Sequence, residues 1–367
     1  MKQKLTRGLD DRYRREYAKL LAKRYGTASS EVKVIVVTGT NGKATTAKYL
    51  QELLFENEQT VALLMPDVNE SLGVKRIQQF LKKAKKDNLR YAIIVLPVSD
   101  IRHHSLVGIA LETVIVTNAS ADDKDLIHQL LDEKPRFIVL NHDDERYEDL
   151  ASAEATSQMI SFGTADEAES KIERINLYRK GSELHLVIDH QTKLKLATYL
   201  VGTANVYNLA AAVTALYVLG ENLHSVDEGA ARLEPQPTNY QYLEAHAPYS
   251  VVLDYSPNEA ALTSVVTTAK KLAKRRLIVV VEADLTSDEQ VETLAGVVDR
   301  LVVVDVNDYK PSRGTIERVV SPDAAIKLAL RAARQDDSVL LAGPIFARPE
   351  QDGSTYADIT IEHTLQD

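Results

Sequence analysis

The segment from residue 32 to residue 50 constrains the fold of this chain more than any other. Four β-branched residues at positions 34–37 precede a loop that contains Gly39 and Gly42, and helical spacing follows from Thr46. Continuous apolar runs of this kind are typical of strands in a parallel sheet whose two faces are covered by helices. The segment therefore predicts a strand, a tight glycine turn and a helix, the repeating unit of an α/β fold.

The loop between this strand and helix has the chemistry of a phosphate-binding loop. Glycines let successive backbone N–H groups point at one anion, and the N-terminus of the helix adds partial positive charge. A lysine can reach the β- and γ-phosphates of a nucleotide, so we predict Lys43 as the catalytic cation. A chance glycine turn is the alternative, and its place directly after an apolar strand disfavours it. The predicted nucleotide-binding residues are Gly39, Thr40, Asn41, Gly42, Lys43, Ala44 and Thr45.

Two features of the loop depart from the usual phosphate-loop pattern, in which Gly is followed by four residues, Gly-Lys and Ser or Thr. Only two residues separate Gly39 from Gly42, and Ala44 occupies the hydroxyl position. That hydroxyl normally ligates the Mg2+ that bridges the phosphates, and alanine cannot do so. Thr45 follows one place later and is expected to point elsewhere on the helix.

Apolar runs divide the chain into two α/β regions, on either side of a proline-containing segment at residues 234–238. The first region contains further expected strands at 92–96, 113–116 and 137–140, and the second contains them at 250–253, 277–281, 301–304 and 339–341. The predicted fold class is therefore α/β, a P-loop-type doubly wound sheet domain followed by a smaller Rossmann-like α/β domain. The predicted divisions are residues 1–30, a basic helix and linker, 31–236, the central domain, and 237–367, the C-terminal domain.

Composition excludes several classes of protein. No apolar run among the 367 residues approaches the ~18 needed for a membrane span. The absence of cysteine removes disulfides, thiolate metal sites and cysteine nucleophiles, and fits a cytoplasmic protein. The net charge of −9 argues against a nucleic-acid partner.

The N-terminal segment is basic and has the spacing of a helix. Residues 1–26 carry a net charge of +6, against −15 for the rest of the chain. This segment is either an arm for an anionic partner protein or an amphipathic helix packed on the body, and we favour the second reading. The apolar residues that recur every four positions along one face are Leu5, Leu9, Tyr13, Tyr17, Leu21 and Tyr25.

The glycine loop, followed by threonines, resembles that of the Mur ligase superfamily. Further segments resemble motifs of the same family in the same order, and together they span nearly all of residues 32–345. The closest match is to the UDP-N-acetylmuramoyl tripeptide synthetases. The segments are residues 96–100, 117–122, 202–212, 254–258 and 321–343.

This resemblance implies an enzyme that uses ATP and Mg2+ to activate a carboxylate as an acyl phosphate, which an amine attacks to form an amide. It implies that Asn205 contacts adenine and that Asp254 also belongs to the nucleotide site. A cell-wall carboxylate precursor and an amino acid are the other implied substrates. Roughly 30 residues precede the first strand, so the family's N-terminal UDP-binding domain is expected to be lacking.

Several family positions that carry chemistry hold other residues here. Asp122 and Asp123, with Asp125, could supply an alternative metal site, and a solvated acidic loop is the other reading. Two functions stay open at this point: an ATP-dependent ligase with an altered site, and a catalytically silent relative that binds a nucleotide or a partner protein. The departures, besides Ala44, are at Pro97, Asp123, Thr238, Asn239, Pro257, Glu282 and residues 343–347.

Overall fold

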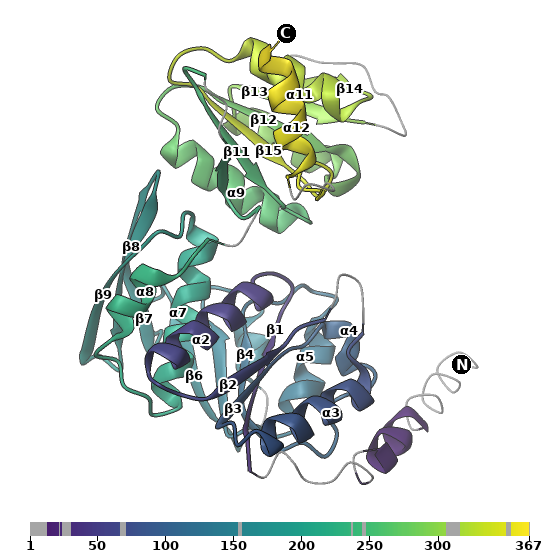
Figure 1. The fold of residues 1–367 in the computed structure, drawn as a ribbon, viewed down its shortest axis with the longest axis vertical. Helices are drawn as coiled ribbons and strands as arrows, with labels where there is room; N and C mark the ends of the chain where they lie inside the picture. Colours follow the sequence, from purple (N-terminus) through teal and green to yellow (C-terminus); the bar gives the residue numbers. More distant parts are fainter. Residues whose placement is uncertain are drawn as a thin grey trace. The chain divides into compact units, whose positions relative to one another are not determined.

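The computed structural model describes residues 13–21, 23, 31–66, 71–152, 156–235, 238–243, 247–305, 316–349 and 354–366. The chain forms two compact units (Figure 1). The first contains Met1–Asn176, Ser182–Tyr199 and Asn205–Leu233, and the second contains Leu177–Gly181, Leu200–Ala204 and Glu234–Asp367. The boundary predicted at residue 236 lies outside the described residues.

The first unit is built on a nine-stranded sheet with the order β2-β3-β1-β4-β5-β6-β7-β8-β9. Its first seven strands pair in parallel, whereas β8 and β9 form an antiparallel pair at one end of the sheet. The strands are β1 (Lys33–Thr38), β2 (Val61–Leu64), β3 (Tyr91–Val95), β4 (Leu111–Val116), β5 (Phe137–Asn141), β6 (Gln158–Gly163), β7 (Ser170–Tyr178), β8 (Gly181–Ile188) and β9 (Thr192–Thr198).

The helix after the glycine loop begins earlier than the sequence pattern suggests, and α7 also starts directly after a glycine. The helix after the glycine loop, α2, begins at Lys43, and α7 begins at Thr203 directly after Gly202, so loop residues belong to first helical turns. The helices of this region are α2 (Lys43–Glu56), α3 (Gly73–Lys86), α4 (Val98–Ile101), α5 (Lys124–Leu131), α6 (Tyr147–Ala151), α7 (Thr203–Val218) and α8 (Val226–Arg232).

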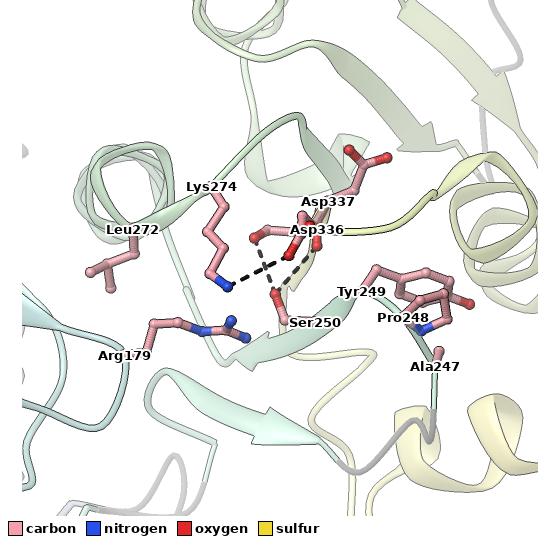
Figure 2. A pocket seen from close by; sticks show the side chains of 10 residues that line it. Arg179, Ala247, Pro248, Tyr249, Ser250, Leu272, Lys274, Asp336 and Asp337 are labelled. Carbon is pink, nitrogen blue, oxygen red and sulfur yellow. Dashed lines mark hydrogen bonds and ion pairs between the residues drawn. The ribbon is translucent and has the colours of Figure 1, made fainter.

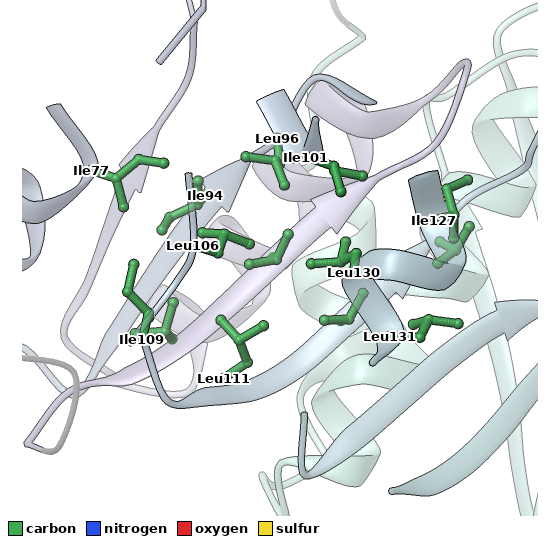
Figure 3. Packing of buried hydrophobic residues seen from close by; sticks show 14 of the residues in the cluster. Ile77, Ile94, Leu96, Ile101, Leu106, Ile109, Leu111, Ile127, Leu130 and Leu131 are labelled. Atoms are coloured by element: carbon green, nitrogen blue, oxygen red, sulfur yellow. The ribbon is translucent and has the colours of Figure 1, made fainter. Parts of the chain in front are cut away.

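The hydrophobic core of the first unit explains why its strands are continuous apolar runs. Val34 and Val36 of β1 face a cluster to which α3, α4, α5 and α6 contribute isoleucine and leucine side chains (Figure 3). Ile35 and Val37 alternate with them, so they point to the opposite face, and they are equally buried. Both faces of the sheet are therefore covered, as in a doubly wound fold.

The N-terminal helix packs on the first unit through only part of the face that its sequence predicts. Residues 13–21 are helical, and Ala18 is buried against Val74 and Val107. Tyr13 and Tyr17, expected on the buried face, are 73% and 55% exposed. Leu21, also on the predicted face, packs partly buried against this cluster, so the prediction is wrong for Tyr13 and Tyr17. The other residues of the predicted face, Leu5, Leu9 and Tyr25, lie outside the described residues.

The second unit has a six-stranded sheet with the order β10-β11-β15-β12-β13-β14, parallel except for the edge strand β10. Helices α9 and α10 pack on one face and α11 and α12 on the other. The α/β fold class, with two such sheets, is confirmed. The elements are β10 (Gln241–Leu243), β11 (Ser250–Asp254), α9 (Glu259–Leu272), β12 (Leu277–Glu282), α10 (Asp288–Val297), β13 (Arg300–Val304), β14 (Ile316–Val319), α11 (Pro322–Ala332), β15 (Ser338–Ala342) and α12 (Tyr356–Gln366).

Candidate nucleotide-binding site

The glycine loop joins the end of β1 to the start of α2 and is held in a shape that only glycine suits. Gly39 and Gly42 have φ angles of +129° and +81°. A Cβ atom on Gly39 would lie 2.4 Å from Thr117 Oγ1, and one on Gly42 would lie 2.3 Å from Asn208 Oδ1. Both positions therefore require glycine for its backbone conformation and for the close approach of a neighbour.

The segment after β4 braces this loop through a set of hydrogen bonds. The Asn118 carbonyl oxygen accepts from the Thr40 N–H at 3.1 Å, and its Oδ1 accepts from the Asn41 N–H at 2.8 Å. Thr117 donates its hydroxyl hydrogen to the Asn41 carbonyl oxygen at 2.6 Å. Because β1 and β4 are adjacent parallel strands, their carboxyl ends bring these residues together.

Lys43 folds back over the loop that precedes it. Its Nζ donates to the carbonyl oxygens of Gly39 at 2.7 Å and Thr40 at 2.9 Å. Burial lowers the pKa of the Lys43 ammonium, and the negative charge of Asp123 partly opposes this effect. The cation thus lies beside the loop, in reach of an anion that the loop amides would hold.

The N-terminus of α2 can accept an anion. In the described part of the chain no side chain caps this end of the helix, and the N-cap position is Gly42. The first N–H groups of a helix have no partner within the helix, so they are available to phosphate oxygens. Ala44 is exposed in this first turn, whereas Thr45 is buried, which agrees with the expectation that Thr45 points elsewhere.

Asp123 and Asp122 differ in their relation to the loop. Thr40 donates its hydroxyl hydrogen to Asp123 Oδ2 at 3.1 Å, and the Ser120 N–H donates to Thr40 Oγ1 at 3.0 Å. Asp122 is exposed. Among the described residues, no group of three or more acidic or histidine side chains is placed to hold a metal ion. The metal site at Asp122 and Asp123 stays a prediction.

Asn205 lies on α7, close to α2. Its side chain is 6% exposed, and its Oδ1 accepts a hydrogen bond from the Tyr49 hydroxyl at 3.3 Å. One turn further along α7, Asn208 Oδ1 accepts from the Thr46 hydroxyl at 3.3 Å. Sequence reasoning missed Tyr49 and Asn208, although the spacing of three residues within each helix placed each pair on a common face.

Asp143 and Asp144, which follow β5, both accept hydrogen bonds from other parts of the chain. The Asp143 carboxylate accepts from the Thr164 N–H at 2.6 Å and from the Tyr207 hydroxyl at 2.5 Å. Burial raises the pKa of Asp143, but these hydrogen bonds outweigh it and leave the pKa below its usual range. Asp144 accepts from the Ala119 N–H at 2.9 Å, so it supports the segment that braces the loop.

Asp254 belongs to the second unit, where it ends β11. Its carboxylate accepts from the N–H groups of Tyr240 and Ser256, both at 2.9 Å, and from the Ser256 hydroxyl at 2.5 Å. Burial raises the pKa of this carboxyl group, and the hydrogen bonds only partly counteract that effect.

Glu282 is the last residue of β12, which lies beside β15 in the same sheet, and it contacts the segment at Gly343 and Ile345 that follows β15. Its Oε1 accepts from the Ile345 N–H at 2.8 Å. A Cβ atom on Gly343, whose φ is +145°, would lie 2.3 Å from the same oxygen. Two segments that the sequence analysis noted as departures therefore hold each other. Burial raises the pKa of Glu282.

A cavity of about 200 Å3 lies at the opposite edge of this second sheet (Figure 2). It adjoins Ser250 and Ser338, the first residues of β11 and β15, whose hydroxyl oxygens are 3.1 Å apart. Lys274 and Asp336 form an ion pair at 3.5 Å on its wall. Open α/β sheets bind ligands beyond the carboxyl ends of their strands, so this amino-terminal edge is not the expected nucleotide site.

Within the described residues, no helix is both long and apolar enough to cross a bilayer.

The glycine loop lies at the carboxyl end of a central strand of a parallel sheet, and an uncapped helix follows it. This arrangement defines an α/β protein of the phosphate-loop class. The family comparison is more specific. The model of the Mur ligase middle domain matches residues 37–216, and that of the Mur ligase glutamate ligase domain matches residues 232–345. The chain belongs to the Mur ligase family.

Individual relatives are distant but aligned over most of their length. A UDP-N-acetylmuramoyl-L-alanyl-D-glutamate--2,6-diaminopimelate ligase of Geobacillus thermodenitrificans is 24% identical, over 90% of this chain and 77% of its own. Among solved structures, MurF from Acinetobacter baumannii has a TM-score of 0.73 at 17% identity, covering 99% of this chain and 80% of that one. MurF from Thermotoga maritima in complex with ADP has a TM-score of 0.72 at 16% identity, with 95% and 83% covered. These structures establish the shared fold.

Proposed function

We propose that this protein is an ATP-dependent ligase that forms an amide between a carboxylate and an amino acid. The braced glycine loop carries the proposal, because it opens into the uncapped N-terminus of α2 with the Lys43 ammonium beside it, the arrangement that binds phosphate groups. Membership of the Mur ligase family supports the same reaction. The names of the relatives support a peptidoglycan precursor as the carboxylate substrate.

The proposed reaction begins when the substrate carboxylate attacks the γ-phosphorus of ATP, which forms an acyl phosphate and releases ADP. The amine then attacks the acyl carbon, loses a proton, and displaces inorganic phosphate. Lys43 and the loop amides would neutralise charge on the transferring phosphoryl group. Asn205 would contact the adenine base, and the nucleotide role of Asp254 stays a prediction.

Mg2+ would find fewer protein ligands here than in a usual phosphate loop. Alanine at position 44 and proline at position 97 offer no side-chain oxygen. Proteins commonly hold Mg2+ with one or two carboxylates and the substrate's own phosphates. Asp123, which accepts the Thr40 hydroxyl beside the loop, fits that role, with Asp122 as the second carboxylate.

The alternative is a catalytically inactive family member that binds a nucleotide and acts as a regulatory or scaffolding protein. One observation favours it: Glu282 occupies the space beside Gly343 and accepts from the Ile345 N–H. The family resemblance places the amino-acid substrate at this late segment, and here a carboxylate of the chain already lies there.

Calorimetric titration with a non-hydrolysable ATP analogue, with and without Mg2+, tests the proposal. We expect binding that Mg2+ strengthens and that Lys43→Ala weakens by about tenfold or more, because a charge-assisted contact to phosphate is lost. Lys82→Ala, on the exposed side of α3, is the matched control and should bind like the wild type.

Failure of the wild type to bind nucleotide at millimolar concentration would contradict the ligase function. If the analogue binds, phosphate release with a panel of carboxylates and amino acids separates the two candidates. Release that requires both a carboxylate and an amine supports the ligase, whereas binding without release supports the inactive alternative.

A further inference from the structure

Two hydrogen bonds join the helix of the phosphate loop to the helix that carries Asn205. Tyr49 and Thr46 lie three residues apart on α2, and Asn205 and Asn208 lie three residues apart on α7. The Tyr49 hydroxyl donates to Asn205 Oδ1, and the Thr46 hydroxyl donates to Asn208 Oδ1, each at 3.3 Å. Residues three apart share a helix face, so the two bonds form a short ladder between the helices.

The two bonds lie at different distances from the loop. Asn208 Oδ1 also lies 2.3 Å from the position of a Cβ atom on Gly42, so this end of the ladder touches the loop itself. Tyr49 lies almost two turns inside α2, and only 1% of its surface is exposed. The Tyr49 bond therefore acts on Asn205 without contacting the loop.

The setting of Tyr49 makes its hydroxyl a lasting partner for Asn205. A buried hydroxyl without a hydrogen bond is unfavourable, so the phenol gains by keeping this acceptor. Burial also raises the pKa of Tyr49, which leaves the phenol protonated at all physiological pH values. The aromatic ring is fixed by the core around it, and the carboxamide of Asn205 is held in turn.

We propose that Tyr49 is a positioning residue for the nucleotide base: it fixes the rotation of the Asn205 carboxamide, and so sets the preference for adenine over guanine. The inference rests on the proposed nucleotide site. Adenine and guanine differ in the donors and acceptors on their edges, so a carboxamide discriminates between them only while its rotation is fixed. Thr46 and Asn208 serve the phosphate end of the same ladder.

The test compares ATP, GTP and tripolyphosphate binding to Tyr49→Phe by calorimetry. Phenylalanine keeps the ring and removes only the hydroxyl. We expect the ratio of ATP to GTP affinity to fall about fivefold, the effect of losing one hydrogen bond, while tripolyphosphate affinity stays unchanged. Tyr91→Phe is the matched control, because Tyr91 is fully buried and its hydroxyl donates to Glu221 at 2.6 Å. It should keep the wild-type ATP to GTP ratio.

A double-mutant cycle with Asn205→Ala shows whether Tyr49 acts through Asn205. If it does, Tyr49→Phe adds nothing to the loss in ATP to GTP ratio already caused by Asn205→Ala. An unchanged ratio in Tyr49→Phe, or an equal loss of tripolyphosphate affinity, would overturn the positioning role while leaving the nucleotide site in place. Absence of ATP binding by the wild type would instead overturn the proposed function, and the inference with it.

Discussion

Gly42 shows how a single residue can serve backbone conformation and packing together. Its φ of +81° lies in the region that favours glycine, and Asn208 Oδ1 approaches the space that a side chain would need. Gly220, which follows the helix α7, has a similar φ of +74°, but no atom lies within 4 Å of its Cβ position. A substitution at Gly220 would therefore cause backbone strain alone, whereas one at Gly42 would cause backbone strain and a steric clash.

We predict that Gly42→Ala lowers the free energy of unfolding by about 2–4 kcal/mol, because it adds a clash with Asn208 to the strain of a positive φ. Gly220→Ala should cost only ~1 kcal/mol, the strain alone. Urea denaturation followed by circular dichroism measures both. Equal losses for the two variants would contradict the close approach of Asn208.

At the scale of elements, Asp337 ties together three strands of the second sheet at their amino ends. Its carboxylate accepts from the Arg276 guanidinium at 2.5 Å and from the Arg334 N–H at 2.8 Å, and its carbonyl oxygen accepts from the Ser250 N–H at 3.0 Å. Asp337 is 1% exposed. Burial raises the pKa of its carboxyl group, but the Arg276 guanidinium and the N–H groups of Arg334 and Arg276 together outweigh that effect and lower the pKa below its usual range.

Asp337→Asn should destabilise the protein by about 2–3 kcal/mol at pH 7, since it leaves a cation and backbone donors without their anion and Arg276 stays partly solvated. Asp336→Asn is the neighbouring control. Its pair with Lys274 is exposed, so the change should stay within ~0.5 kcal/mol. Chemical denaturation at neutral pH measures both values.

The pH dependence of the Asp337 effect has a definite sign. Because the folded-state pKa is depressed, the stabilisation is fully present above the unfolded pKa of about 3.9 and is lost as the pH falls through the folded value. The difference in unfolding free energy between wild type and Asp337→Asn should therefore be constant from pH 5 to 8 and shrink below about pH 4. A difference that persists undiminished at pH 3 would contradict the ionised pair.

The elements show what sequence reasoning could and could not foresee. Apolar β-branched runs predicted the central strands β1, β3, β4 and β5 of the first sheet and β11, β12, β13 and β15 of the second, because burial on two faces leaves no polar positions. The bracing of the loop by Asn118, and the contact of Tyr49 with Asn205, join residues 77 and 156 positions apart. Local periodicity contains no information on such pairs. The prediction for Tyr13 and Tyr17 of the N-terminal helix was wrong for a similar reason, because the surface on which a helix packs, and not spacing alone, decides which of its side chains are buried.

At the scale of the whole molecule, the division into two units means that the effect of a ligand on the stability of one unit can be measured apart from the other. The loop, its brace and both helices of the ladder belong to the first unit, whereas Asp254 and Glu282 belong to the second. Each unit has its own core on both faces of its own sheet. Two such cores are expected to unfold in separable steps.

We predict that ATP stabilises chiefly the first unit. At a concentration 100 times Kd it should add about 2.7 kcal/mol, equivalent to a rise of roughly 5–10 °C in the midpoint of that unit's unfolding. Hydrogen exchange with mass spectrometry during heating would assign the shifted transition to peptides from β1, α2 and β4. A shift confined to peptides of the second unit, or one of undiminished size in Lys43→Ala, would contradict the proposed site.

The antiparallel strand β9 at the end of the large sheet has a consequence for how copies of the protein behave in concentrated solution. An outermost strand has unpaired backbone groups that can recruit a strand from another molecule and start aggregation. Lys193 and Lys195 lie two residues apart on β9 with their side chains exposed, and Lys195 forms an ion pair with Glu183 of β8 at 3.0 Å. An added strand would have to desolvate these charged side chains, so they oppose pairing of this edge with a second copy.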